Sequence, residues 1–304
     1  MAISRAQLVK ELEPGLNALF GLEYKRYENQ HAEIYNVESS DRAFEEEVML
    51  SGFGNAQVKG EGQGISFDDA QETFTARYTH ETVALAFAIT EEAIEDNLYD
   101  RISSRYTKAL ARSMSNAKQV KAVTPLIDGL PSTDSFDSGD GVSLFNTAHT
   151  TVSGTNVKNT LTTQADLNET SLEQSLIDIA AMTDERGLRI AARGVKMIVP
   201  SANQFTAERL MKSQGRTGTA DNDINAIGSM GMIPQGYRVN NYLTDSDAFY
   251  IITDVPNGMK MFQRAPLKTA MEGDFDTGNV RYKARERYSF GVSDYRGIFG
   301  VEGA

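Results

Sequence analysis

Cysteine and tryptophan are absent from this chain of 304 residues, and histidine occurs only three times. Without cysteine the protein has no disulfide and no thiolate zinc site. Long apolar runs are also missing: none approaches the roughly 20 residues that cross a membrane. The polar, charged stretch from Gln7 to Glu13 shows no signal peptide. These absences predict a soluble, cytoplasmic protein without a membrane partner.

Basic residues are fewer than acidic ones: the chain has 30 Lys and Arg and 42 Asp and Glu, which gives a net charge of -12. A protein that grips nucleic acid through phosphates is expected to be basic. The balance instead favours a soluble surface, a container wall or a protein partner. The hydrophobic content of 40% is enough for one large domain or two intimately joined domains.

Residue patterns for catalysis or metal binding are also lacking. The three histidines share no metal-binding or nucleophile motif and are interpreted as partly exposed structural residues: His31, His80 and His149. The run from Asp221 resembles a calcium loop, but Ala226 and Met232 stand where glycine and an acid are required. The glycines at 60–64 lack the Gly-Lys-Ser ending of a phosphate loop. The sequence therefore predicts no catalytic residue, no cofactor site and no metal site.

Glycine is concentrated after an N-terminal region that we interpret as short helices, one beginning at Pro14, and an extended arm. The dense positions are Gly52, Gly54, Gly60, Gly62 and Gly64. Such density predicts a mobile, extended loop with little core of its own. Apolar residues then alternate with alanine from Val83 to Ile89, which predicts a strand. With a second strand at 73–80, this makes a long hairpin that extends the loop. The acidic run at 45–47 is interpreted as a solvated face.

The segment from Thr90 to Val123 carries the strongest helix pattern. Thr90 is a candidate N-cap. Acidic residues are concentrated near the predicted N-terminus of the helix and basic residues near its C-terminus, a distribution that the helix dipole favours. Its apolar positions recur every four residues and form a winding stripe: Ile94, Leu98, Ile102, Tyr106, Leu110 and Met114. A winding stripe predicts a spine helix that crosses several neighbours in turn.

The remaining chain predicts an α+β fold of two interleaved parts. Residues 131–165 are polar and aperiodic, which indicates a long surface excursion. A helix is expected from Thr170 to Gly187, with Leu172, Leu176, Ile179 and Ala180 inward. A short helix is expected at 201–212, and strands at 196–199, 237–243, 249–253, 259–263 and 280–292.

This order of elements resembles the major capsid proteins of tailed double-stranded DNA phages with the Hong Kong 97 phage fold, especially the Mu-type major head subunits. The stretches that carry the resemblance are Lys59–Gly62, Thr90–Asn97, Leu144–His149, Phe262–Pro266, Asp274–Thr277 and Arg287–Gly291. Together they span nearly the whole chain.

The resemblance implies four parts: an N-terminal arm (1–51), an extended loop hairpin (52–89), a peripheral domain with the spine helix and long strand (90–195 and 255–304), and an axial domain (196–254). It implies pentamers and hexamers that form an icosahedral head, enclosing DNA without base recognition or a cofactor. Portal, scaffolding and decoration proteins are the implied partners, and the virion capsid is the location. The loop would lie across a neighbouring subunit, so its glycines, Lys59 and Glu61 become candidate interface residues. Lys59 also sits where some relatives carry a crosslinking lysine.

The last predicted strand carries a row of bases on one face: Arg281, Lys283, Arg285 and Arg287. Its other face presents Tyr282, Ala284, Glu286 and Tyr288. Aligned like charges repel, and three explanations remain open: solvation with counterions, DNA in the lumen, or acids of the same or an adjacent subunit. The acid candidates are Glu91, Glu92 and Glu95, or the run at 45–47. We assign the row to the candidate subunit interface.

Two other functions remain as alternatives. An encapsulin-like nanocompartment shell would have the same fold and enclose enzymes. A cytoplasmic hydrolase or binding protein would be a small oligomer with a defined small-molecule ligand.

Overall fold

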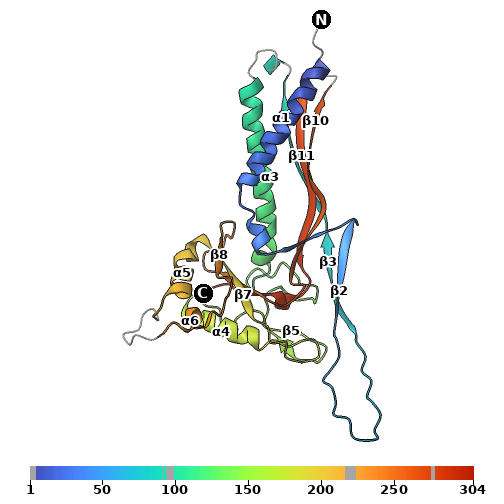
Figure 1. Ribbon diagram of the computed structural model, residues 1–304, viewed down its shortest axis with the longest axis vertical. Coiled ribbons are helices and arrows are strands. Elements are labelled where there is room, and N and C mark those ends of the chain that lie inside the picture. The colour runs from blue at the N-terminus through green and yellow to red at the C-terminus, as the bar shows by residue number, and fades with distance from the viewer. Residues whose placement is uncertain (1–4, 91, 94–98, 216–223, 275–277) are drawn as a thin grey trace.

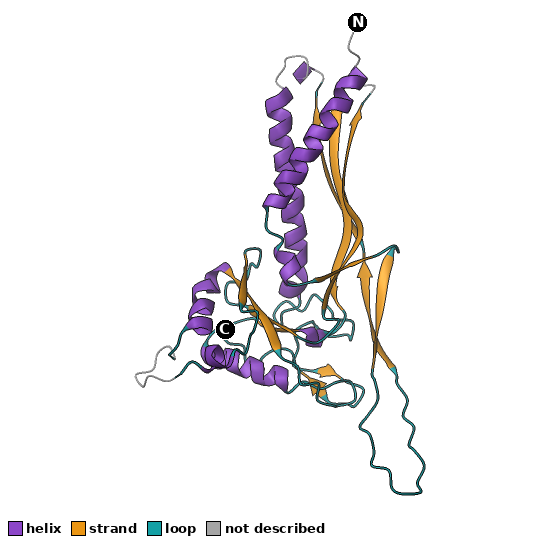
Figure 2. Cartoon of the chain, viewed as in Figure 1, coloured by secondary structure: helices purple, strands orange, loops and turns teal. Residues whose placement is uncertain are grey.

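The computed structural model describes residues 5–90, 92–93, 99–215, 224–274 and 278–304. Figure 1 shows an elongated upper part, where two helices run beside long strands, above a lobe of shorter elements. The helices are α1 (Arg5–Arg26) and α3 (Tyr99–Asp128). A two-stranded ribbon with a long loop projects beside the lobe (Figure 2).

The upper part is built on a sheet with the strand order β1-β10-β11-β4. Its strands are β1 (Asn36–Ser39), β10 (Met259–Gly273), β11 (Val280–Val292) and β4 (Glu81–Ile89). β1 is parallel to β10, and the other two pairs are antiparallel. One face of this sheet packs against both long helices.

Apolar side chains on that face form a separate small core. Its buried members are Leu16 and Phe20 from α1, Leu110, Ala111 and Met114 from α3, and Tyr282 and Ala284 from β11. The opposite face of the sheet has no helix over it among the described residues (Figure 1). The upper part is therefore a two-layer structure with one covered and one open face.

The lobe surrounds a second sheet, of order β12-β9-β7-β8. Its strands are β7 (Gly194–Pro200), β8 (Tyr237–Asn240), β9 (Phe249–Thr253) and β12 (Ile298–Val301). Its helices are α4 (Glu169–Ala180), α5 (Gln204–Lys212) and α6 (Ala226–Met230), with 3-10 turns η1 (Gln30–Glu33), η2 (Ser201–Asn203) and η3 (Tyr295–Gly297) and the short pair β5 (His149–Thr150) and β6 (Asn156–Val157). Because β12 closes a sheet that begins at residue 194, the two parts interleave in sequence. The domain boundaries themselves stay a prediction.

Several predicted elements are confirmed. β9 and β11 have the predicted bounds, and α5 ends at the predicted Lys212. The Thr90 hydroxyl accepts the Ala93 N–H at 3.4 Å, but positions 91 and 94–98, between Thr90 and α3, lie outside the described residues. The spine helix ends at Asp128, five residues beyond the predicted Val123. β10 runs ten residues beyond its predicted end, because pairing with β11 extends the strand past two bulges.

The helix boundaries need correction. Pro14 does not begin a second helix: α1 continues through it. α4 begins after Asn168, whose side chain accepts the Ser171 N–H, and it ends at Ala180 instead of Gly187. Ala180 is exposed, contrary to prediction.

The apolar stripe of the spine helix is partly confirmed. Leu110 and Met114 are buried. Tyr106 is 51% exposed, because its ring lies at the rim of the sheet against Phe87. The predicted positions 94 and 98 lie outside the described residues.

The strand partners of the hairpin were also predicted wrongly. β2 (Phe44–Leu50) pairs with β3 (Glu72–Thr79), and residues 51–71 form the loop between them. β4 pairs with β11 in the upper sheet. The acidic run at 45–47 is therefore part of a strand.

Candidate subunit interface

The loop between β2 and β3 is extended and projects away from the lobe (Figure 2). Within residues 52–70, all of them described, the one backbone–backbone hydrogen bond runs from the Gln63 N–H to the Gly60 carbonyl. Gly52 and Gly62 have φ of 65° and 76°, which favours glycine. Side chains bind a few other backbone groups of the loop: the Asp68 carboxylate accepts the Gly54 N–H, and Arg186 donates to the Asp69 carbonyl. The remaining backbone groups, those of residues 64–67 among them, are left to solvent or to another chain.

Large apolar side chains on this loop are exposed. The exposed fractions are 62% for Phe53, 98% for Val58, 73% for Ile65 and 96% for Phe67. Four such side chains on one projecting loop mark a surface for another protein. The loop residues of the predicted site, Lys59 and Glu61 included, therefore lie together on one exposed segment.

The predicted basic row lies on the open face of the upper sheet. Along β11, Arg281, Lys283 and Arg285 are exposed and alternate with buried residues, while Arg287 is half-buried. Arg281 forms an ion pair with Asp274. Among the described residues, no carboxylate forms an ion pair with the other three members of the row. The structure places the row and the loop on separate parts of the subunit.

The acids at 45–47 do not neutralise the row within one subunit. Glu47 binds Lys260 at 2.6 Å, and Glu46 lies 3.7 Å from Arg77. Glu45 accepts a hydrogen bond from Ser40. Of the other candidates, Glu92 is exposed, and positions 91 and 95 lie outside the described residues.

A buried ion pair lies behind the row, between helix and sheet. The Lys118 ammonium on α3 is 2.8 Å from Glu286 on β11, whose side chain is 0% exposed. Burial raises the pKa of Glu286, and the nearby Lys118 opposes this shift. The second carboxylate oxygen has no hydrogen-bond partner among the described residues. This pair fixes one position of the spine helix on the sheet.

The excursion at 131–165, predicted to lie on the surface, is partly core. Leu144, Phe145, His149 and Asn159 are all 0% exposed. His31 and His80 are buried as well, at 6% and 5%, so none of the histidines is partly exposed as predicted. Turn-forming residues dominate the composition of this segment. The few buried residues among them form no periodic pattern, so the sequence did not reveal them.

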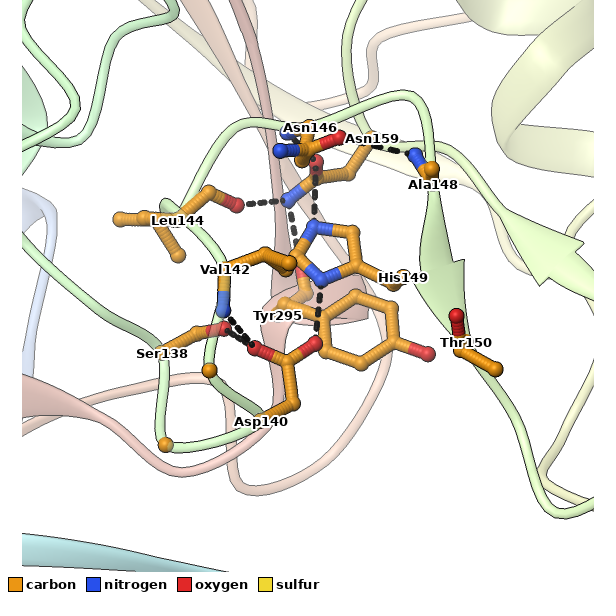
Figure 3. Close-up of polar contacts among 12 residues, drawn as sticks. Ser138, Asp140, Val142, Leu144, Asn146, Ala148, His149, Thr150, Asn159 and Tyr295 are labelled. Atoms are coloured by element: carbon orange, nitrogen blue, oxygen red, sulfur yellow. Dashed lines mark hydrogen bonds and ion pairs between the residues drawn. The ribbon is translucent and has the colours of Figure 1, made fainter.

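Figure 3 shows how His149 ties this excursion to the C-terminal segment. Its Nδ1 lies 2.6 Å from the Asp140 carboxylate, and its Nε2 lies 3.1 Å from the Asn159 side-chain oxygen. The ring stacks on Tyr295 with 3.8 Å between centroids. The Asn159 amide donates to the carbonyls of Leu144 and Tyr295. The motif Leu144–His149 was the available sequence signal for this cluster.

His149 is enclosed by its partners, and across the described ranges no three acidic or histidine side chains converge as metal ligands. None of the described helices is long and apolar enough to cross a bilayer. The geometry on the surface is that of contacts between proteins.

Comparison with known proteins identifies the family. The family model described as phage capsid protein matches residues 72–301. No curated protein matches.

Among solved structures, the virus-like particle from Pyrococcus furiosus is 10% identical with a TM-score of 0.53, covering 95% of this chain and 98% of that one. The capsid of Myoviridae phage XM1 is 11% identical with a TM-score of 0.53, covering 89% of each chain. The capsid of the empty GTA particle is 14% identical with a TM-score of 0.53, covering 90% of this chain and 89% of that one. At such identities these likenesses show the fold.

The resemblance to major capsid proteins of tailed phages with the Hong Kong 97 phage fold is thereby confirmed, and the encapsulin-like alternative is not favoured. The chain belongs to the phage capsid protein family and is a structural major capsid protein of the virion.

Proposed function

We propose that this protein is a Mu-type major head subunit that forms pentamers and hexamers of an icosahedral shell around double-stranded DNA. It acts without catalysis or a cofactor. The observation that carries the proposal is the 52–70 loop, which forms a single backbone–backbone hydrogen bond and whose large apolar side chains are exposed. Such a segment is stabilised only when another chain covers it.

In this assembly the loop of each subunit lies across a neighbour, and the basic row is part of the receiving surface. The segment from Phe44 to Thr79 supports this pairing, because it carries seven acids and two bases. Exposed ion pairs are individually weak, commonly under ~1 kcal/mol. Repeated at every subunit contact, they steer assembly and make it sensitive to salt.

DNA is enclosed without being gripped. The net charge of -12 opposes tight binding of the phosphate backbone. Portal, scaffolding and decoration proteins complete the head as separate partners.

The test is negative-stain microscopy of the purified protein, followed by analysis of what nuclease-treated particles protect. Closed shells that enclose DNA when produced with the phage packaging proteins support the proposal. A monodisperse small oligomer at assembly conditions contradicts it. Shells that retain an enzyme cargo instead of DNA revive the nanocompartment alternative.

A further inference from the structure

The two edges of the upper sheet are protected unequally. Beyond its pairing with β1, the free edge of β10 contains Pro266 and two register shifts, between Gln263 and Ala265 and between Ala265 and Lys268. Proline and bulges prevent a further strand from pairing there. β4 has neither feature: it pairs with β11 over nine consecutive residues without a shift. No described strand pairs with its outer side.

The two faces of β4 differ in chemistry. On the open face, Ala84, Ala86 and Ala88 are exposed. They pair with Arg285, Lys283 and Arg281 of the basic row. Small side chains on the edge strand leave the bases accessible from beyond that edge.

On the helix face of β4, Leu85 is 47% exposed. The Phe87 ring contacts Tyr106, itself half exposed, with 5.8 Å between centroids. A strand added to this edge therefore places alternate side chains against an apolar rim and against a basic row. Its sequence must alternate apolar residues with small polar or acidic ones.

Residues 64–68, on the side of the loop that leads into β3, have this alternation of apolar and small polar or acidic residues. In residues 64–68, extended as a strand, Ile65 and Phe67 would lie on one face and Ser66 and Asp68 on the other, because side chains alternate along a strand. The Asp68 carboxylate accepts the Gly54 N–H at 2.6 Å, and this hydrogen bond holds its pKa below the usual value, so it is charged at neutral pH. Residues 53–58, on the other side of the loop, lack the pattern: Phe53 and Val58 are five positions apart and would lie on opposite faces of a strand.

We propose that residues 64–68 of one subunit add as a fifth strand to the β4 edge of a neighbouring subunit. Ile65 and Phe67 then cover Leu85 and Tyr106, while Asp68 faces the basic row. Backbone hydrogen bonds satisfy groups that are unpaired on both segments, and the alternating side chains set the register. This inference rests on the proposed shell-forming function and specifies which surface receives the loop.

The absence of cysteine allows a direct test by disulfide mapping. Ser66→Cys is combined in turn with Ala84→Cys, Ala86→Cys or Ala88→Cys, and shells are assembled under reducing conditions and then oxidised. Directly opposed strand residues lie within disulfide reach. At least one pair should give covalent multimers on non-reducing gels.

The matched control is Ser66→Cys with Leu85→Cys, which places the second thiol on the other face of β4. Its yield should be at least tenfold lower. Equal yields at Leu85, or intact shells that crosslink at none of the alanine positions, overturn the strand addition while leaving shell formation intact. If the unsubstituted protein forms no shells, it is the proposed function that fails.

A second pair of variants covers the case in which the cysteine variants do not assemble. Phe67→Ser and Val58→Ser remove side chains that are 96% and 98% exposed. The inference predicts at least tenfold slower assembly for Phe67→Ser, measured by light scattering, and an unchanged rate for Val58→Ser. Equal effects of the two substitutions contradict it.

Discussion

Replacing Lys118 with methionine tests the energetics of the spine helix. The substitution keeps an unbranched side chain but leaves the Glu286 carboxylate, 0% exposed, without its cation. Breaking a buried pair in this way costs about 3–5 kcal/mol. A loss of that size should lower the Tm of the unassembled 304-residue subunit by roughly 5–8 °C at pH 7.

The stability lost in Lys118→Met should depend on pH, and the raised pKa of Glu286 sets the direction of that dependence. The pKa of Glu286 is already raised by burial even with Lys118 present. A carboxyl group whose folded pKa exceeds its unfolded value of about 4.3 takes up a proton on folding. Its contribution to stability is complete below the unfolded pKa and is lost as the pH rises through the folded pKa. The deficit of Lys118→Met should therefore shrink between pH 7 and pH 5.

The control is the double variant Lys118→Met with Glu286→Leu, which replaces both charges by apolar groups. It should recover most of the lost stability, because an apolar pair needs no compensating charge. Calorimetry of the parent and both variants at the two pH values supplies the measurement. A single variant as stable as the parent at pH 7, or a double variant no better than the single one, would refute the buried-pair account.

Other predictions concern the core, the loop anchor and the basic row. Leu110→Ala should cost about 2–5 kcal/mol, since the side chain is 4% exposed between helix and sheet; an unchanged melting temperature would contradict the winding-stripe interpretation. His149→Phe keeps a ring against Tyr295 but removes the partner of the Asp140 Oδ2 oxygen, so it should cost about 1–3 kcal/mol and hasten proteolysis within 131–165. Arg285→Glu with Arg287→Glu should give folded subunits that do not close into shells; normal shells with normal salt dependence would leave only solvation to explain the row.

The regular strands were predictable from sequence because their patterns are unambiguous. β11 alternates basic and buried residues from Val280 to Tyr288, and the structure gives the strand its predicted bounds. The glycine loop was equally clear, because its composition excludes a packed core. The α+β class followed from these elements.

Elements whose pattern depends on distant partners were not predictable. β2 was missed because its acidic run conceals an alternation in which the exposed residues, apart from Glu46, are the apolar Phe44, Val48 and Leu50. The buried anchors at 144–149 were missed because they contact residues more than a hundred positions away, such as Tyr295. Pro14 was taken as a helix start, although packing of α1 on α3 and the sheet keeps the helix continuous.

In the candidate interface, too, local features were predictable from the sequence and long-range contacts were not. The loop and the basic row were each found from local sequence. Their relation depends on which sheet edge is left free, and only the pairing of β4 with β11 provides that information.

The most direct test of the central claim is deletion of residues 57–63, which shortens the loop without touching either sheet. The account predicts subunits with an unchanged far-ultraviolet spectrum and melting temperature that form no stable shells in negative-stain images, beside closed shells from the intact protein. Normal, stable shells from the deletion variant would contradict the claim that this loop joins neighbouring subunits.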